Sequence, residues 1–354
     1  MGLLQATIRQ ISGQDHEWRR KAKERLDQLA IPHWALGRLM DLAMDLAGQT
    51  RSMRPPVARK AVITMAGDHG VAAEGVSKFP QEVTSQMVAN FVNGGAGINV
   101  LARGVGADVV VVDMGVAADL SALVRAGRLI DKKIAFGTAN MAKGPAMSRE
   151  QAVQAIEAGI DIVTSLGARY DLFGTGDMGI ANTTPSSAIV AALTEQSARE
   201  VTGRGTGLDD RQLAAKIRVI DAALALNRPD PMDGLDVLAK VGGFEIAGIA
   251  GVILGAAALR KPVLVDGFIS TAGALIAHKL APESTQFIIA AHRSLEPGHS
   301  LMQDYLGVEP LLDLNLRLGE GTGAALAMPM VEAAVRVLTE VATFAEAAVA
   351  GADK

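Results

Sequence analysis

The stretch AVITMAGDHG, residues 61–70, decides the fold class. Its first six residues form a nearly continuous apolar run, which is typical of a strand buried on both faces, as in a parallel sheet. Gly67 ends the run, and an Asp-His pair follows it. Because ligands of such sheets bind at the carboxyl ends of the strands, this stretch predicts a buried strand that runs into a ligand crevice.

Four more short apolar runs follow, with helical stretches between them. This alternation predicts an α/β fold with a doubly wound, mostly parallel, Rossmann-like sheet. Glycines cluster where we expect the strands to end, most densely at Gly174, Gly176 and Gly179. The four runs are residues 109–113, 170–173, 262–265 and 287–291.

Both ends of the chain are helical in pattern. Residues 18–29 and 36–46 carry apolar side chains at helical spacing, and residues 328–350 are rich in Ala and Val. We expect these ends to pack together as a smaller helical lobe. The expected division is an N-terminal part of this lobe at residues 1–55, an α/β catalytic domain at 56–327 and a C-terminal helix at 328–354.

Composition excludes several classes of function. The net charge of −4 and an aromatic content of 3% argue against a nucleic-acid partner. The chain has no cysteine and only six histidines without a metal-binding spacing, so we predict no metal site. Without an apolar signal core or a run of ~18 apolar residues, we expect a cytoplasmic protein with no membrane span.

Residues 174–184, GTGDMGIANTT, could bind a phosphate. Glycines expose backbone N–H groups, and the following helix adds its positive end and the hydroxyl groups of Thr183 and Thr184. The same residues also suit a tight turn capped by threonine. The ending of a P-loop is absent. Glu195 lies near the spacing of a ribose-binding acid, which leaves a dinucleotide-dependent oxidoreductase as an alternative.

Glu320 stands in the turn LGEGTG, residues 318–323, ahead of an apolar helix. A carboxylate held between glycines and shielded from water has a raised pKa and can act as a general base. The turn could equally be a helix start with an acid in its first turn. Lys216 follows a second glycine cluster, residues 203–207, and could either pair with a phosphate or lie in solvent.

Nine segments spread over nearly the whole chain resemble one family, the nicotinate-nucleotide–dimethylbenzimidazole phosphoribosyltransferases of cobalamin lower-ligand assembly. Each segment alone is modest, but their number and order make the resemblance specific. The segments are residues 67–71, 74–76, 80–84, 144–148, 179–185, 233–238, 241–245, 266–268 and 317–324.

The resemblance implies an enzyme that converts nicotinate mononucleotide and 5,6-dimethylbenzimidazole, or a related base, into α-ribazole 5′-phosphate and nicotinate. Neither a metal nor another cofactor is implied. The incoming base must lose a proton, and by resemblance Glu320 accepts it. Asp177 is a candidate for a second acid that stabilises the positive charge developing on the ribose.

The same resemblance implies the binding residues and a homodimer. The nucleotide and its phosphate are assigned to Gly176, Gly179, Asn182, Thr183, Gly205, Lys216, Ser294 and Gly321. The aromatic base is assigned to Phe79, Pro80, Gln81 and Met87.

Two departures from the family pattern concern the choice of base. Residues 31–37 read IPHWALG, where many relatives carry Lys-Pro-Pro-Gly-Ser-Leu-Gly. Asp177 stands where relatives often have Glu. The natural base is therefore left open. A nucleotide sensor without catalysis is a further alternative, although the retained Glu320 argues against it.

Overall fold

Six parallel strands form the main sheet of the protein, whose computed structural model describes residues 2–350. Their order is β3-β2-β1-β4-β5-β6, which is the order of doubly wound nucleotide-binding sheets and confirms the predicted fold class. A two-stranded sheet pairs β7 with β8. The strands are β1 Lys60–Gly67, β2 Ala107–Gly115, β3 Ile130–Asp131, β4 Leu172–Met178, β5 Val263–Val265, β6 Ile288–Ala290, β7 His292–Ser294 and β8 Leu312–Leu316.

The five predicted apolar runs all overlap strands, but one strand, β4, extends further along the chain than its predicted run. β4 begins at Leu172 and continues to Met178, so Gly174 and Gly176 lie inside a strand and not in a loop after it. The strand pairs with β1 on one side and β5 on the other, and this pairing extends it through the glycines. The sequence pattern did not predict β3, β7 or β8.

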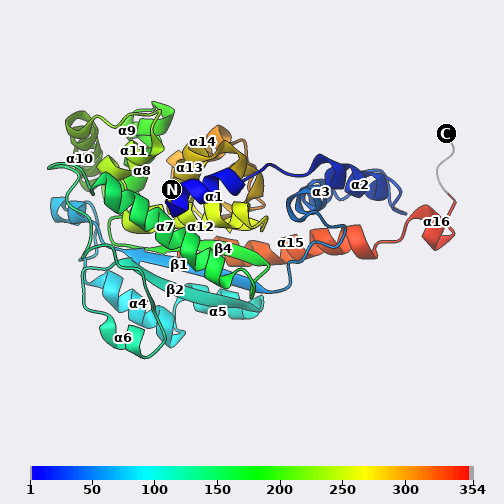
Figure 1. Cartoon of the computed structure of the whole chain (residues 1–354). Helices are drawn as coiled ribbons and strands as arrows, with labels where there is room; N and C mark the ends of the chain where they lie inside the picture. The colour runs from blue at the N-terminus through cyan, green and yellow to red at the C-terminus, as the bar shows by residue number, and fades with distance from the viewer. Residues whose placement is uncertain (1, 351–354) are drawn as a thin grey trace.

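Helices cover both faces of the main sheet (Figure 1). Their bounds are α1 Leu3–Gln10, α2 His16–Leu26, α3 Arg38–Thr50, η1 Gly70–Glu74, α4 Val83–Asn93, α5 Gly97–Gly104, α6 Ser121–Arg125, α7 Arg149–Leu166, α8 Thr183–Thr194, α9 Ala198–Val201, α10 Asp210–Asn227, α11 Gly234–Val241, α12 Phe244–Ala258, α13 Phe268–Leu280, η2 Pro282–Phe287, α14 Gly298–Leu306, α15 Thr322–Glu340 and α16 Phe344–Ala347.

Alternate side chains of β1 enter two separate cores. Ile63 and Met65 join the core formed with α7, α8, α12 and α13, whereas Val62 and Ala66 join the core formed with α4, α5 and α15. A strand buried on both faces has no polar alternation, which explains the continuous apolar run in the sequence.

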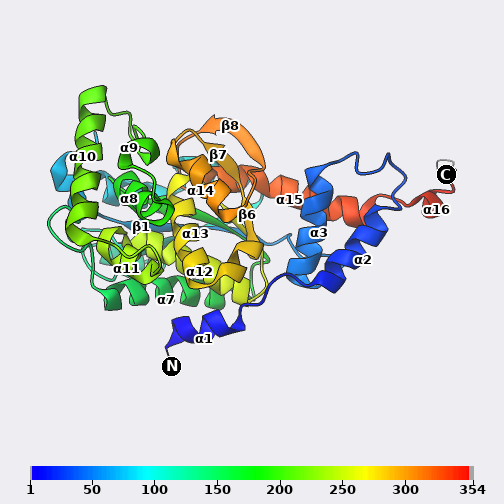
Figure 2. The same ribbon diagram turned by 90° about the horizontal axis from the view of Figure 1, so that it is seen from above.

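The helices α2 and α3 and the C-terminal part of α15 project from the sheet as a helical arm (Figure 2). The first helix departs from the expected division, because α1 packs on α7 and α12 of the main body. Among the described residues, α15 is the one helix long and apolar enough for a membrane span. However, 56% of its apolar window is buried within the fold, as in the core helix of a globular protein.

Candidate active site

A cavity of about 480 Å³ opens at the carboxyl ends of β4 and β5. Its walls come from the turn before α15, the loop before α8, the residues after β5, the strand β7 and the segment before α4. The lining residues are Val76, Ser77, Phe79, Val83, Met87, Asp177, Met178, Gly179, Ile180, Ala181, Asn182, Thr183, Gly205, Thr206, Gly267, Phe268, Ile269, His292, Ser294, Glu296, Arg317, Leu318, Gly319 and Glu320.

Glu320 occupies a turn of unusual backbone geometry on one wall. Gly319, Glu320 and Gly321 have φ values of 82°, 64° and 97°, so three consecutive residues adopt left-handed conformations. Thr64 Oγ1 donates to the Glu320 carbonyl oxygen at 3.1 Å. At Gly176, a Cβ atom would lie 2.2 Å from that carbonyl oxygen, so only glycine lets the turn rest on β4. The backbone of the turn is therefore held by the sheet beneath it.

The carboxyl group of Glu320 is buried and anchored. Its Oε2 accepts a hydrogen bond of 3.0 Å from the Ile98 N–H group at the start of α5. Burial and, to a smaller degree, the charge of Asp266 raise the Glu320 pKa, although the Ile98 bond opposes this shift. A carboxylate with a raised pKa is a better proton acceptor, which is the property that the predicted general base requires.

Asp177 ends β4 beside this turn. Its Oδ2 accepts a 2.9 Å hydrogen bond from Asn182 Nδ2. Burial, followed by the charges of Asp266, Glu245 and Glu320, raises the pKa of Asp177 to about 8. With this pKa the Asp177 carboxyl group is mostly protonated at neutral pH, and a cation placed in the cavity would favour its ionised form.

Donor groups for an anion gather at the start of α8. Thr183 begins this helix, and its Oγ1 accepts a 2.6 Å hydrogen bond from Lys216 Nζ of α10. Lys216 is fully buried behind Thr183 and does not itself line the cavity. Burial lowers the Lys216 pKa to about 8. Gly179, Asn182, Gly205 and Ser294 line the cavity, as their assignment to a nucleotide requires.

Besides Lys216, two more residues assigned to the nucleotide do not line the cavity. Gly176 lies inside β4 under the Glu320 turn. Gly321 donates its N–H group to Asp266 Oδ2 at 3.1 Å, so this donor is already used. Both glycines instead allow the backbone of the turn to approach the sheet closely.

The residues assigned to the aromatic base divide in a similar way. Phe79 and Met87 line the cavity together with Val76, Val83 and Leu318, whereas Pro80 and Gln81 do not. Pro80 and Gln81 shape the chain before α4, where their carbonyl groups accept hydrogen bonds from the Val83 and Thr84 N–H groups. This wall of the cavity is largely apolar.

Comparison with known proteins identifies the family. A sequence model described as a phosphoribosyltransferase matches residues 11–349. The nicotinate-nucleotide–dimethylbenzimidazole phosphoribosyltransferase of Syntrophotalea carbinolica is 65% identical, over 99% of both chains. The chain belongs to this phosphoribosyltransferase family. The enzyme of the same name from Desulfotalea psychrophila is 59% identical over the full length of both chains. The crystal structure of CobT from Thermus thermophilus superposes with a TM-score of 0.90 at 45% identity, covering 95% of this chain and 100% of that one.

Membership in the phosphoribosyltransferase family confirms the resemblance seen in the sequence and makes the protein an enzyme. It also disfavours the oxidoreductase and sensor alternatives, because the matched relatives are named as phosphoribosyltransferases. The comparisons do not test the role of any single residue, so the site assignments stay predictions.

Three ionisable residues that line the cavity of this phosphoribosyltransferase were not assigned from the sequence, namely His292, Glu296 and Arg317. A fourth unassigned residue, Asp266, lies behind the wall, and its carboxylate accepts from the Gly321 and Ala324 N–H groups. Asp266 and Arg317 stand in segments that carried the family resemblance. However, the contacts of Asp266 join residues 55 and 58 positions apart, which no local pattern could indicate.

The Asp-His pair after β1 has a structural role. His69 Nε2 lies 2.7 Å from Glu245 Oε1 of α12, with both side chains buried. Asp68 Oδ2 accepts from the Ala117 N–H group at 2.8 Å. These contacts tie the loop after β1 to the start of α12 and to the loop after β2. In the described part of the chain, no group of three or more metal-binding side chains is found.

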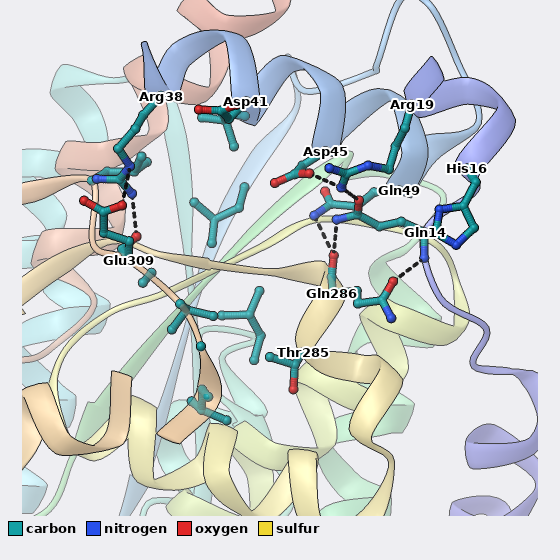
Figure 3. Close-up of a pocket in the computed structure, with 18 residues that line it drawn as sticks. Gln14, His16, Arg19, Arg38, Asp41, Asp45, Gln49, Thr285, Gln286 and Glu309 are labelled. Atoms are coloured by element: carbon teal, nitrogen blue, oxygen red, sulfur yellow. Dashed lines mark hydrogen bonds and ion pairs between the residues drawn. The ribbon is translucent and has the colours of Figure 1, made fainter. Parts of the chain in front are cut away.

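A larger cavity of about 670 Å³ separates the helical arm from the main body (Figure 3). Four of its charged residues form two ion pairs, Arg19 with Asp45 and Arg38 with Glu309. None of the assigned site residues lines it. The altered segment at residues 31–37 joins α2 to α3 on this arm and lines neither cavity.

Proposed function

We propose that the protein transfers the phosphoribosyl group of nicotinate mononucleotide to 5,6-dimethylbenzimidazole or a related base, giving α-ribazole 5′-phosphate and nicotinate for the nucleotide loop of cobalamin. The observation that carries this proposal is one cavity that combines the buried carboxylate of Glu320 with the anion-binding groups at the start of α8. The high identity to relatives named for this reaction supports it.

The bond changes are simple. One benzimidazole nitrogen attacks C1′ of the ribose, and the bond from C1′ to the pyridinium nitrogen breaks. Its electron pair returns to the pyridine ring, so nicotinate leaves with a neutral ring nitrogen. This departure requires neither a metal nor a redox cofactor. The proton on the second benzimidazole nitrogen must then be removed, and Glu320 is the proposed acceptor.

Asp177 has the proposed role of stabilising positive charge on the ribose. The pyridinium ring of the bound nucleotide is a cation, and its approach lowers the Asp177 pKa from about 8 and favours ionisation. Asp177 would thus become negative only when the nucleotide is present. The negative charges of Asp266 and Glu245 contribute to the raised pKa of Asp177 that the cation would oppose.

The phosphate is proposed to bind at the start of α8, near Thr183, Gly205 and Ser294. Lys216 acts there through its charge and through the Thr183 hydroxyl group that it holds. The aromatic base is proposed to lie against Phe79 and Met87, where an apolar wall suits a planar ring. Pro80 and Gln81 support this wall through the turn before α4.

The remaining features of the proposal concern the whole protein. We propose a homodimer that acts in the cytoplasm, with the sheet domain as the catalytic unit and the helical lobe, formed by both ends of the chain, as a second unit. The names of the relatives, which describe a biosynthetic reaction on small molecules, support a cytoplasmic enzyme.

The proposal is tested by incubating the purified protein with nicotinate mononucleotide and a panel of benzimidazoles, purines and phenols, with product masses as the readout. We expect a benzimidazole ribotide phosphate. In equimolar competition, dimethylbenzimidazole should exceed adenine by about 10-fold, because burying the polar edges of adenine without partners costs about 1–3 kcal/mol per group. Predominance of the adenine product would contradict the proposed base pocket.

A further inference from the structure

Glu296 is an acid at the place where an anion is expected to bind. It follows β7, lies immediately before α14 and lines the active-site cavity. Its Oε1 accepts a 3.1 Å hydrogen bond from the Gly205 N–H group, while its Oε2 is buried without a hydrogen-bond partner. A Cβ atom at Gly203 would lie 1.9 Å from Oε2, so the carboxylate fits a niche left by that glycine.

The groups around this carboxylate are the ones assigned to the phosphate. Lys216 and Glu296 attract each other, and this attraction opposes the shift that burial imposes on each of their pKa values. Arg317 adds a second positive charge near Glu296, and its Nη1 donates to the Gly205 carbonyl oxygen at 3.4 Å. The Glu296 carboxylate therefore accepts from the Gly205 N–H group and balances the charges of Lys216 and Arg317.

We propose that the Glu296 carboxylate competes with the nucleotide phosphate for the Gly205 N–H group and is displaced when the phosphate binds. This inference rests on the proposed function, because it requires a phosphate at the start of α8. One N–H group cannot donate fully to a carboxylate and to a phosphate at once. The negative charges of the two groups would also repel each other if both lay beside Gly205.

Lys216 lies close to the N–H group for which the two anions compete. Its ammonium group lies behind Thr183, and a Cβ atom at Gly205 would be 3.4 Å from it. Departure of the carboxylate frees the Gly205 N–H group and removes the nearest balancing charge of Lys216. The phosphate then accepts from the Gly205 N–H group and balances the charge of Lys216. A ligand without a phosphate can do neither, so it does not displace Glu296.

The test compares the wild-type enzyme with Glu296→Gln by calorimetric titration with nicotinate mononucleotide and with nicotinate riboside. The glutamine retains an oxygen for the Gly205 N–H group but carries no charge. We expect at least a 10-fold lower Kd for the mononucleotide and an unchanged Kd for the riboside. Glu283→Gln, an exposed position on η2, is the matched control for net charge and should change neither Kd.

An unchanged or higher Kd for the mononucleotide in Glu296→Gln would overturn the inference while leaving the proposed function intact. If the wild-type enzyme does not bind the mononucleotide, the proposed function fails and the inference fails with it. A crystal structure of the wild-type enzyme with the mononucleotide is a second test that needs no variant. It should show the Gly205 N–H group on phosphate, and a retained bond to Glu296 would overturn the proposal.

Discussion

Glu320 joins three properties that a surface acid does not have together: burial, a left-handed backbone and an anchoring hydrogen bond from the Ile98 N–H group. Its glycine neighbours made it recognisable in the sequence as a positioned acid. Which group would anchor it could not be read there, because Ile98 lies 222 residues away.

Glu320→Gln preserves the shape of this side chain and removes its basicity. We expect the rate of phosphoribosyl transfer to fall by about 10² or more, because general-base catalysis contributes roughly that factor. Binding of nicotinate mononucleotide should persist. Steady-state kinetics and calorimetry measure the two effects. The exposed Glu340→Gln, at the far end of helix α15, is the control, and normal turnover in Glu320→Gln would refute the assignment.

Lys216 gives the nucleotide site a pH dependence. Burial lowers its pKa to about 8, and a bound phosphate favours the charged form. Above pH 8 Asp177, whose pKa is also about 8, is already ionised while Lys216 loses its charge, so the Kd of nicotinate mononucleotide should rise toward about 10-fold per pH unit. Titrations between pH 7 and 9 measure this change.

Lys216→Met should weaken mononucleotide binding by about 10-fold or more at pH 7, because a charged donor contributes about 1.5–3 kcal/mol. It should also abolish the rise in Kd above pH 8. The exposed Lys143→Met is the control and should retain both affinity and pH dependence. A pH dependence that survives in Lys216→Met would assign it to another group.

At the scale of elements, the turn before α15 is the feature on which the site geometry depends. Gly321 has φ +97°, and a Cβ atom there would lie 2.4 Å from Val62 Cγ1 and 3.1 Å from the Thr175 carbonyl oxygen. Gly321→Ala should lower the free energy of unfolding by more than about 2 kcal/mol, since backbone strain and overpacking each contribute about 1–3 kcal/mol.

Urea denaturation measures this loss. Gly104→Ala is the matched control, because a Cβ atom at Gly104 would have no other atom within 4 Å and the residue ends helix α5. That variant should be neutral or slightly stabilised. Equal stability of the two variants would mean that the turn can relax without strain.

Elements differed in how well the sequence predicted them. β1 and β2 were predictable because burial on both faces leaves a continuous apolar run. β4 was predicted too short, because Gly174 and Gly176 indicate a turn by local rules, whereas pairing with β1 and β5 keeps them extended. β7 and β8 were not predicted, because short strands with polar residues show no continuous apolar run.

At the scale of the whole molecule, the helical arm leaves apolar surface exposed. Leu36 and Met330 of this arm are 41% and 36% exposed. A projecting arm with such side chains suits contact with a second subunit, in line with the proposed homodimer. Sedimentation equilibrium should give a mass of twice 36.7 kDa at micromolar concentration. A mass of one chain under conditions of full activity would contradict the dimer.

The central claim is transfer of the phosphoribosyl group to an aromatic nitrogen, and not to water. The most direct measurement is the stoichiometry of the products when the wild-type enzyme meets nicotinate mononucleotide with and without dimethylbenzimidazole. With the base, we predict one α-ribazole 5′-phosphate for each nicotinate released, and without it almost no nicotinate. Release of nicotinate with ribose 5-phosphate, at a rate independent of the base, would contradict the account.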